Sequence, residues 1–227
     1  MGCLPTAVKR NIVVTMELDG TSPVRRIGRP RSFDRNSAIA VAMRLFWRHG
    51  YEGTSIAALT ECIGITPPSL YTAFGDKRQL FREAVDLYLG GPSAVASAIE
   101  AAPTSYDAAR DLLTAAAIGD TGEDTPPGCL LASSIVTCSA SSADMREELA
   151  GIRRGIEAAL RSRIECDVKG GVLPTDTDAE MLAGHVFAIV QGMSTLAKDG
   201  ASRNKLLRIV DSAMACWPIA MSGSGRA

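Results

Sequence analysis

Apolar residues in the first third of the chain recur with the period of an amphipathic helix. Four of them, spaced i, i+3, i+4 and i+7, would share one helix face: Ile39, Ala42, Met43 and Phe46. Asp34 could accept hydrogen bonds from the free N–H groups of the first turn, and Gly50 could end the helix. The pattern therefore predicts a helix that begins after Asp34 and stops at Gly50.

A second, shorter helix is predicted to end at Gly64. Either Thr54 or Ser55 could be its N-cap, because both carry the hydroxyl that caps a helix start. The residues that would face inward are Ile56, Leu59 and Ile63. Gly64 would then form the turn into the next helix.

The third predicted helix begins with two adjacent prolines. With Thr66 as N-cap, Pro67 and Pro68 occupy the first two helical positions, where a backbone N–H has no partner within the helix. Leu70 and Phe74 lie four residues apart and would pack inward. The opposite face would be small and uncharged, and it would carry Pro67, Pro68, Ser69 and Thr72, with Tyr71 at its flank.

Two short helices joined by a glycine turn, the second exposing its N-terminal residues, match the helix-turn-helix arrangement that enters a DNA major groove. The hydroxyls of Ser69 and Thr72 could pair with base edges, and the rings of Pro67 and Pro68 could contact a thymine methyl. Tyr71 could reach a phosphate. The third helix is therefore a candidate recognition helix.

A fourth helix is predicted from Asp76, its N-cap, to Leu89, with Lys77 in its first turn. A lysine at the positive end of a helix dipole is unfavourable unless an anion lies there. Lys77 is therefore a candidate phosphate contact.

The remaining chain also carries helical patterns, and the polar loop 119–128 interrupts them. The expected helices span about 93 to 102, 105 to 118, a stretch that begins at Cys129, 143 to 165, 177 to 198 and 203 to 217. Aromatic residues make up only 5% of the chain, and no series of short alternating segments appears. The sequence thus predicts an all-α protein.

Charge separates the first third from the rest. Residues 24–90 hold ten Lys and Arg against six Asp and Glu, a net charge of +4, whereas residues 91–227 hold twelve against seventeen, a net charge of −5. The basic stretch 24–33 places Arg29 and Arg31 beside Gly28 and Pro30, a slim extended arm that could enter an A·T-rich minor groove. A loose arm that touches phosphates non-specifically is the alternative.

The six cysteines form no C-x-x-C pair and have no histidine at metal-ligand spacing, so we expect no metal site and no cofactor. No apolar run of bilayer length and no secretory signal appear, so we expect no membrane partner and a cytoplasmic location with reduced thiols. Residues 1–23 lack periodicity and are predicted to be a disordered tail, and Met16 could be the true start.

Residues 42–81 resemble the DNA-binding domain of the tetracycline-repressor-like (TetR) family of bacterial transcription regulators. The residues that carry the resemblance are Phe46, Gly50-Tyr51, Thr54-Ser55, Gly64, Leu70-Tyr71, Phe74, Lys77 and Leu80-Phe81. The resemblance implies a homodimer that binds double-stranded operator DNA. It also implies phosphate contacts by Thr54, Thr66, Tyr71 and Lys77, and base readout by residues 67–72. Ser55, beside Thr54, is a further candidate DNA contact.

The sequence departs from the family pattern at Ala57, where a long polar residue is common, and at Thr72, where a second aromatic is common. We therefore expect helix three and the arm to carry more of the base readout than helix two does.

The last two helices are candidates for dimerisation. An apolar stripe on the first of them is wider than one neighbouring helix would cover, and it includes Met181, His185, Ile189 and Met193. From periodicity alone, monomer core is the commoner explanation, and the family resemblance favours an interface.

Taken together, these patterns predict a DNA-binding domain with its arm over 24–89 and a ligand-binding and dimerisation domain over 90–227. The expected function is a transcriptional regulator, a repressor that an unknown small-molecule inducer releases from a palindromic operator. A cysteine-based redox sensor is the second possibility. A small helical enzyme is the third, and it lacks support because no phosphate loop or nucleophile elbow is present and Cys129, Cys138 and His185 have no supporting local motif.

Overall fold

A computed structural model describes residues 33–136 and 143–218 of the chain. The tail 1–23 and the arm residues Arg29 and Arg31 lie outside the described residues. Every regular element within the described ranges is an α-helix, as the sequence predicts. These helices are α2 (Arg35–Gly53), α3 (Ile56–Ile63), α4 (Pro67–Phe74), α5 (Lys77–Leu89), α6 (Ala94–Ala101), α7 (Ser105–Gly119), α8 (Leu130–Val136), α9 (Ala143–Lys169), α10 (Ala179–Lys198) and α11 (Arg203–Ala215).

The helix starts of the first third follow the predicted caps. Asp34 accepts hydrogen bonds from the backbone N–H groups of Asn36 and Ser37, Ser55 accepts from Ala58, and Thr66 accepts from Ser69. The prolines occupy the first two positions of α4. The prediction for the start of α4 is therefore confirmed, and Ser55, not Thr54, is the N-cap of α3.

The regular geometry of the first helix ends at Gly50, as predicted. α2 continues to Gly53, but Gly50 interrupts it with φ 71° and ψ 173°. A positive φ is accessible to glycine at little cost, and it redirects the chain so that Tyr51 packs against the aromatic rings of Phe46 and Phe81. Gly50 is thus a sharp break inside α2.

The core of helices α2 to α5 contains the residues predicted to face inward. Phe46, Leu59, Leu70 and Phe81 are fully buried, and the rings of Phe46 and Phe81 meet edge to face with centroids 4.9 Å apart. Burying each of these side chains stabilises the fold by about 1.5–3 kcal/mol. This packing leaves the rest of the α4 surface free.

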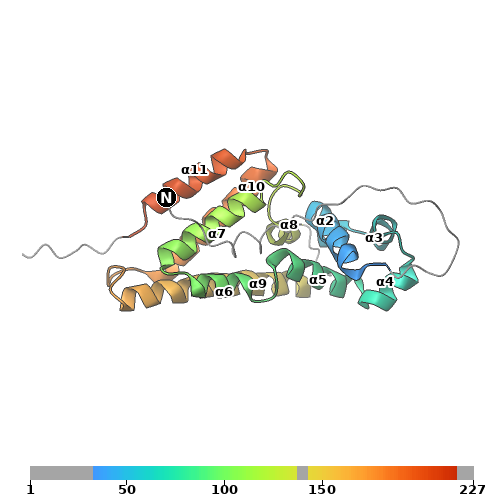
Figure 1. Ribbon diagram of the computed structural model, residues 1–227, viewed down its shortest axis with the longest axis horizontal. Coiled ribbons are helices and arrows are strands. Elements are labelled where there is room, and N and C mark those ends of the chain that lie inside the picture. The colour runs from blue at the N-terminus through green and yellow to red at the C-terminus, as the bar shows by residue number, and fades with distance from the viewer. Residues whose placement is uncertain (1–32, 137–142, 219–227) are drawn as a thin grey trace, which may run out of the picture.

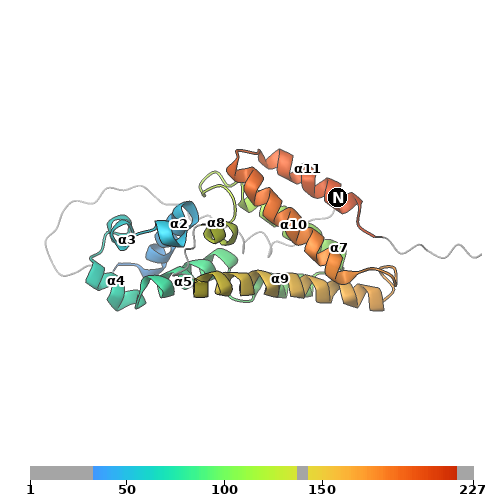
Figure 2. The same ribbon diagram turned by 180° about the vertical axis from the view of Figure 1, so that it is seen from behind.

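The second half of the chain forms its own core around α9, which extends along the lower edge of the molecule (Figure 1). Seen from behind, α10 crosses above α9, and α11 lies above α10 (Figure 2). Buried residues from five helices meet there: Ile99, Leu113, Leu160, Ile164, Met193 and Leu206. The helices α9 and α7 end at Lys169 and Gly119, beyond the predicted limits, and α10 and α11 are shorter than predicted.

Helix α8 joins the two halves because it packs on α2. Leu130, Leu131, Met145 and Leu149 come from α8 and α9, yet they are part of the buried core that α2 to α5 form. The two cores therefore meet through α8 and the start of α9.

Candidate nucleic-acid interface

Helix α4 presents the surface that the sequence predicts for a recognition helix. Leu70 and Phe74 are buried, whereas the side chains on the outer face are exposed: Thr66, Pro67, Pro68, Ser69, Tyr71 and Thr72. Tyr71 is 48% exposed, which is unusual for a large aromatic side chain. The helix that carries these residues is held by two buried anchors, so its outer face is a rigid platform.

The hydroxyl groups on α4 are oriented by local hydrogen bonds. The Thr66 and Ser69 hydroxyl oxygens lie 2.9 Å apart, and the Thr72 hydroxyl donates to the Pro68 carbonyl oxygen at 2.8 Å. A hydroxyl that donates its proton still has lone pairs that accept. Thr72 in this arrangement can accept a hydrogen bond from a donor on a base edge.

Two residues that were expected to contact DNA, Ser55 and Thr54, lie in different environments: Ser55 is exposed and Thr54 is buried. Ser55 is exposed at the N-terminus of α3 and is available to DNA. Thr54 is only 1% exposed, and its hydroxyl donates to the Gly50 carbonyl oxygen at 2.7 Å. Contrary to the expectation, Thr54 therefore stabilises the chain at the break in α2 and does not present its side chain to a phosphate.

Lys77 lies at the first position of α5, directly after the turn that follows α4. Its ammonium nitrogen is 4.5 Å from the centroid of the Tyr51 ring. Desolvation lowers the pKa of Lys77, and the nearby Glu52 carboxylate opposes that shift. Lys77 is half-buried, and only Gly75 and Asp76 separate it from the end of α4.

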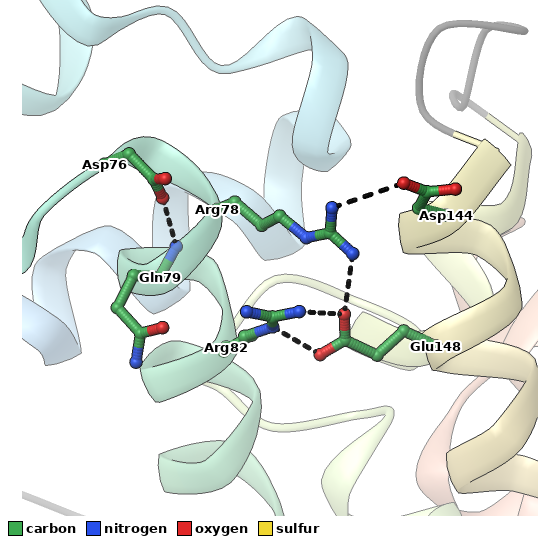
Figure 3. Close-up of polar contacts among 6 residues, drawn as sticks. All are labelled: Asp76, Arg78, Gln79, Arg82, Asp144 and Glu148. Atoms are coloured by element: carbon green, nitrogen blue, oxygen red, sulfur yellow. Dashed lines mark hydrogen bonds and ion pairs between the residues drawn. The ribbon is translucent and has the colours of Figure 1, made fainter.

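An ion-pair cluster connects α5 to α9 (Figure 3). Arg82 donates two hydrogen bonds to the Glu148 carboxylate, at 2.6 and 2.8 Å, and Arg78 donates a third at 3.3 Å. Arg78 also lies 3.5 Å from Asp144. The hydrogen bond from Arg82 is the main cause that lowers the pKa of Glu148, so this carboxylate stays charged over a wide pH range. We call these four residues the α5–α9 clamp.

A second contact between the halves involves the loop before α8. The Trp47 indole N–H donates to the Gly128 carbonyl oxygen at 2.6 Å, and the Tyr88 hydroxyl donates to the Cys129 sulfur at 3.3 Å. Gly128 has φ 80°, and a Cβ there would lie 2.8 Å from the Lys198 side chain. Gly128 is therefore required both for its conformation and for the close packing of α10.

Asp120 closes this loop and is itself buried. Its backbone carbonyl accepts from the Gly128 N–H at 2.9 Å, and its side chain is 2% exposed. Among the described residues, the carboxylate oxygen Oδ2 has no hydrogen-bond partner. Burial raises the pKa of Asp120 to about 7, and the positive charge of Lys198 opposes this rise.

The predicted dimer stripe on α10 divides into two faces. Met193 is fully buried in the core of its own chain, so the expectation that it contacts a partner does not fit this placement. Met181 is 69% exposed, His185 is exposed and Ile189 is half-buried. The exposed face continues through Ala188 and Gly192, whose small size would let a second helix approach closely.

Comparisons with known proteins agree with this arrangement. The model of the bacterial regulatory proteins of the tetR family matches residues 38–84, and the model of the tetracyclin repressor-like C-terminal domain matches residues 107–212. The chain is 36% identical over 207 residues to the HTH-type transcriptional repressor ComR of Escherichia coli (strain K12), covering 89% of this chain and 98% of ComR.

The chain belongs to the TetR family of bacterial transcriptional regulators.

Two further relatives, the TetR family transcriptional regulator CifR and the repressor BdcR, bear on the DNA-binding half. A structure of the regulator CifR, as a cysteine variant bound to a 26-bp double-strand operator DNA, is 39% identical; it covers 84% of this chain and 100% of CifR with a TM-score of 0.77. The HTH-type transcriptional repressor BdcR of Escherichia coli (strain K12) is 46% identical over 63 residues, which is 28% of this chain and 32% of BdcR. The protein is thus a transcriptional regulator with an N-terminal helix-turn-helix and an all-helical C-terminal half.

Sequence reasoning missed the contacts between the two halves. The paired residues of the α5–α9 clamp are 66 to 70 positions apart, so no local pattern connects them. Asp120 lies in the polar loop 119–128, where a carboxylate is ordinarily solvated, so no sequence pattern indicates that it is buried. The described residues contain no cluster of three or more His, Cys, Asp or Glu that could hold a metal, and no described helix is long and apolar enough to cross a membrane.

Proposed function

We propose that this protein is a homodimeric repressor that binds a palindromic operator and is released by a small-molecule inducer. The observation that carries the proposal is the rigid outer face of α4, with Pro67, Pro68, Ser69, Tyr71 and Thr72 exposed on a helix anchored by Leu70 and Phe74. In a dimer, two such helices would lie in successive major grooves about 34 Å apart. Tyr71, Thr66, Ser55 and Lys77 would contact the backbone phosphates, and the basic arm with Arg29 and Arg31 would add contacts in the minor groove.

The experiment that tests this proposal is footprinting on the DNA that flanks the gene. We expect one protected site with two-fold sequence symmetry and half-sites one helical turn, about 10 base pairs, apart or a multiple of that spacing. Uniform weak protection along every fragment would show that the protein lacks sequence-specific binding.

The inducer would act on the contacts between the two halves. A ligand that binds among the helices of the C-terminal half and displaces α9 or α8 would also displace α5 and α2, because the α5–α9 clamp and the α8–α2 packing connect them. The spacing of the two α4 helices would then change, and affinity for DNA would fall. By linkage, operator DNA would weaken inducer binding by the same factor.

Glu148→Gln should weaken operator binding several-fold, because α5 without the clamp samples orientations that do not match the groove spacing. The glutamine keeps the size of the side chain but loses the charge that pairs with Arg78 and Arg82. The matched control is Glu147→Gln, since Glu147 pairs with Arg154 within α9 and does not connect the halves. Fluorescence anisotropy with the footprinted duplex measures both variants, and equal affinities for Glu148→Gln and wild type would remove the clamp from the mechanism.

A cysteine-based redox sensor is the second candidate, and the position of Cys129 favours it. Cys129 precedes α8 at the junction, where Tyr88 donates to its sulfur and Ser194 accepts from its backbone N–H at 2.8 Å. Burial raises the pKa of this thiol, so it is neutral at pH 7 and reacts only when the junction opens.

Hydrogen peroxide would convert the Cys129 thiol to a sulfenic acid and release water, and the added oxygen would disrupt the contact with Tyr88. Peroxide should then lower DNA affinity in wild type and in Cys62→Ser, whose exposed thiol lies on α3, but not in Cys129→Ser. A loss of affinity that persists in Cys129→Ser would exclude this cysteine as the sensor.

A further inference from the structure

Tyr51 forms a fixed aromatic surface directly beneath the first residue of α5. Its ring is stacked on Phe46, with centroids 6.2 Å apart and an interplanar angle of 23°, and it is tilted against Phe81 at 5.1 Å. Phe46 and Phe81 are fully buried, so they do not move independently of the core. The positive φ of Gly50 turns the chain to bring Tyr51 into this position.

The ammonium group of Lys77 lies over this ring, 4.5 Å from its centroid. This distance is within the range of a cation–π interaction, which holds a cation over the negative face of the ring. Lys77 is the first residue of α5, and the positive N-terminus of a helix disfavours a positive charge there, although the nearby Glu52 carboxylate favours the charged form. Without the ring, a lysine here would extend into solvent and sample many rotamers.

We infer that Tyr51 is a positioning residue for DNA binding, which holds the Lys77 ammonium at the place where a backbone phosphate is bound. This inference rests on the proposed phosphate contact of Lys77. The positive end of α5 and the preplaced ammonium would act on one phosphate together, and the entropy of ordering the lysine is lost on folding, before DNA binds. Tyr51 itself touches no phosphate in this account.

The experiment is a double-mutant cycle on non-specific DNA, for which phosphate contacts supply nearly all the affinity. The probe is a fluorescein-labelled duplex of about 30 base pairs with random sequence, at low salt, so that the operator need not be known. Lys77→Gln should weaken binding about tenfold and lower the slope of log K against log salt. Tyr51→Leu should weaken binding about threefold to tenfold when Lys77 is present and less than twofold in the Lys77→Gln protein.

Tyr51→Phe is the conservative control, because it keeps the aromatic face and should keep wild-type affinity within about twofold. Tyr51 also packs against the core, so Tyr51→Leu could lower stability. A second series therefore replaces Tyr51 with phenylalanines that carry one, two or three fluorines, which weaken the negative ring face while the ring keeps nearly its size. Affinity should fall stepwise along this series in the Lys77 protein and stay constant in the Lys77→Gln protein.

The outcomes separate the inference from the proposal on which it rests. If Lys77→Gln binds the duplex as wild type does, Lys77 contacts no phosphate, and that part of the proposed function is wrong. If Lys77→Gln weakens binding but the fluorinated series does not, the phosphate contact stands and the positioning role of Tyr51 is overturned. A stepwise loss that is the same with and without Lys77 would also overturn it, because the ring would then act through the core.

Discussion

Asp120→Asn should remove a pH dependence of stability that wild type shows between about pH 4 and pH 7. Burial raises the folded-state pKa of Asp120 from 3.8 to about 7. Between these two values the unfolded chain has released the proton while the folded chain still holds it. The free energy of unfolding of wild type therefore falls as pH rises through this window, at about 1.4 kcal/mol per pH unit, and levels off above pH 7.

Between about pH 4 and pH 7, the ionisation of this one carboxyl group lowers the free energy of unfolding of wild type by up to about 4 kcal/mol. The Asp120→Asn variant does not show this decrease, because an amide does not titrate. The groups that surround the carboxylate are Tyr88 on α5, Cys129 before α8 and Lys198 on α10, and Lys198 is the one that favours the charged form.

Urea unfolding at fixed protein concentration, repeated from pH 4 to pH 8, measures the difference in the free energy of unfolding between the variant and wild type. That difference should grow with pH, whatever constant offset the amide introduces. The control is Asp124→Asn, an exposed carboxylate in the same loop, for which the difference should stay constant. A constant difference for Asp120→Asn as well would mean that Asp120 is ionised in the folded protein throughout this range.

Gly192→Glu should dissociate the proposed dimer and weaken operator binding by a hundredfold or more, on the order of 3 kcal/mol. Gly192 is exposed on α10, and a Cβ there would have no atom within 4 Å, so the single chain accommodates the substitution. In a dimer with α10 at its interface, the change would bury two unpaired carboxylates near a two-fold axis. One helix-turn-helix alone would then bind the operator, without the effective concentration that a linked second head provides.

The matched control is Gly155→Glu, because Gly155 is also an exposed helical glycine with open space around it, but on α9. Both substitutions favour the helix by several tenths of a kcal/mol, so a difference between them cannot come from helix propensity. Sedimentation velocity gives the mass of each variant, and anisotropy gives its affinity for the operator. A Gly192→Glu protein that stays dimeric with full affinity would place the interface on another surface.

The sequence predicted the DNA-binding half almost residue by residue. Caps such as Asp34, Thr66 and Asp76 act on N–H groups two or three positions away, so the local sequence contains all the information needed to place a helix start. Leu70 and Phe74 identify the inner face of α4 for the same reason, because the helical period alone puts them on one side. Once these two inward positions are known, the residues on the opposite side of the helix are predicted to be exposed.

The sequence left other features of the site undecided or predicted them wrongly, because they depend on how the helices pack against one another. Periodicity could not show that Met193 fills its own core while His185 on the same helix is exposed, since both belong to one broad apolar stripe. Thr54 carried the hydroxyl expected at a helix start, but the break at Gly50 turned it inward to the Gly50 carbonyl. Whether each of these side chains is buried or exposed depends on which part of the chain packs beside it.

By itself the sequence determined the helical class, the order of the helices, the N-caps of α2, α4 and α5 and the exposed face of α4, because these arise from interactions within a few residues. Only the tertiary structure decided how the two halves contact each other. The α5–α9 clamp, the indole hydrogen bond of Trp47 to Gly128 and the desolvated carboxylate of Asp120 all join residues that are distant in the chain or depend on distant neighbours. Desolvation and ion pairing act through space, so their strength is set by the packing of helices that the local pattern does not specify.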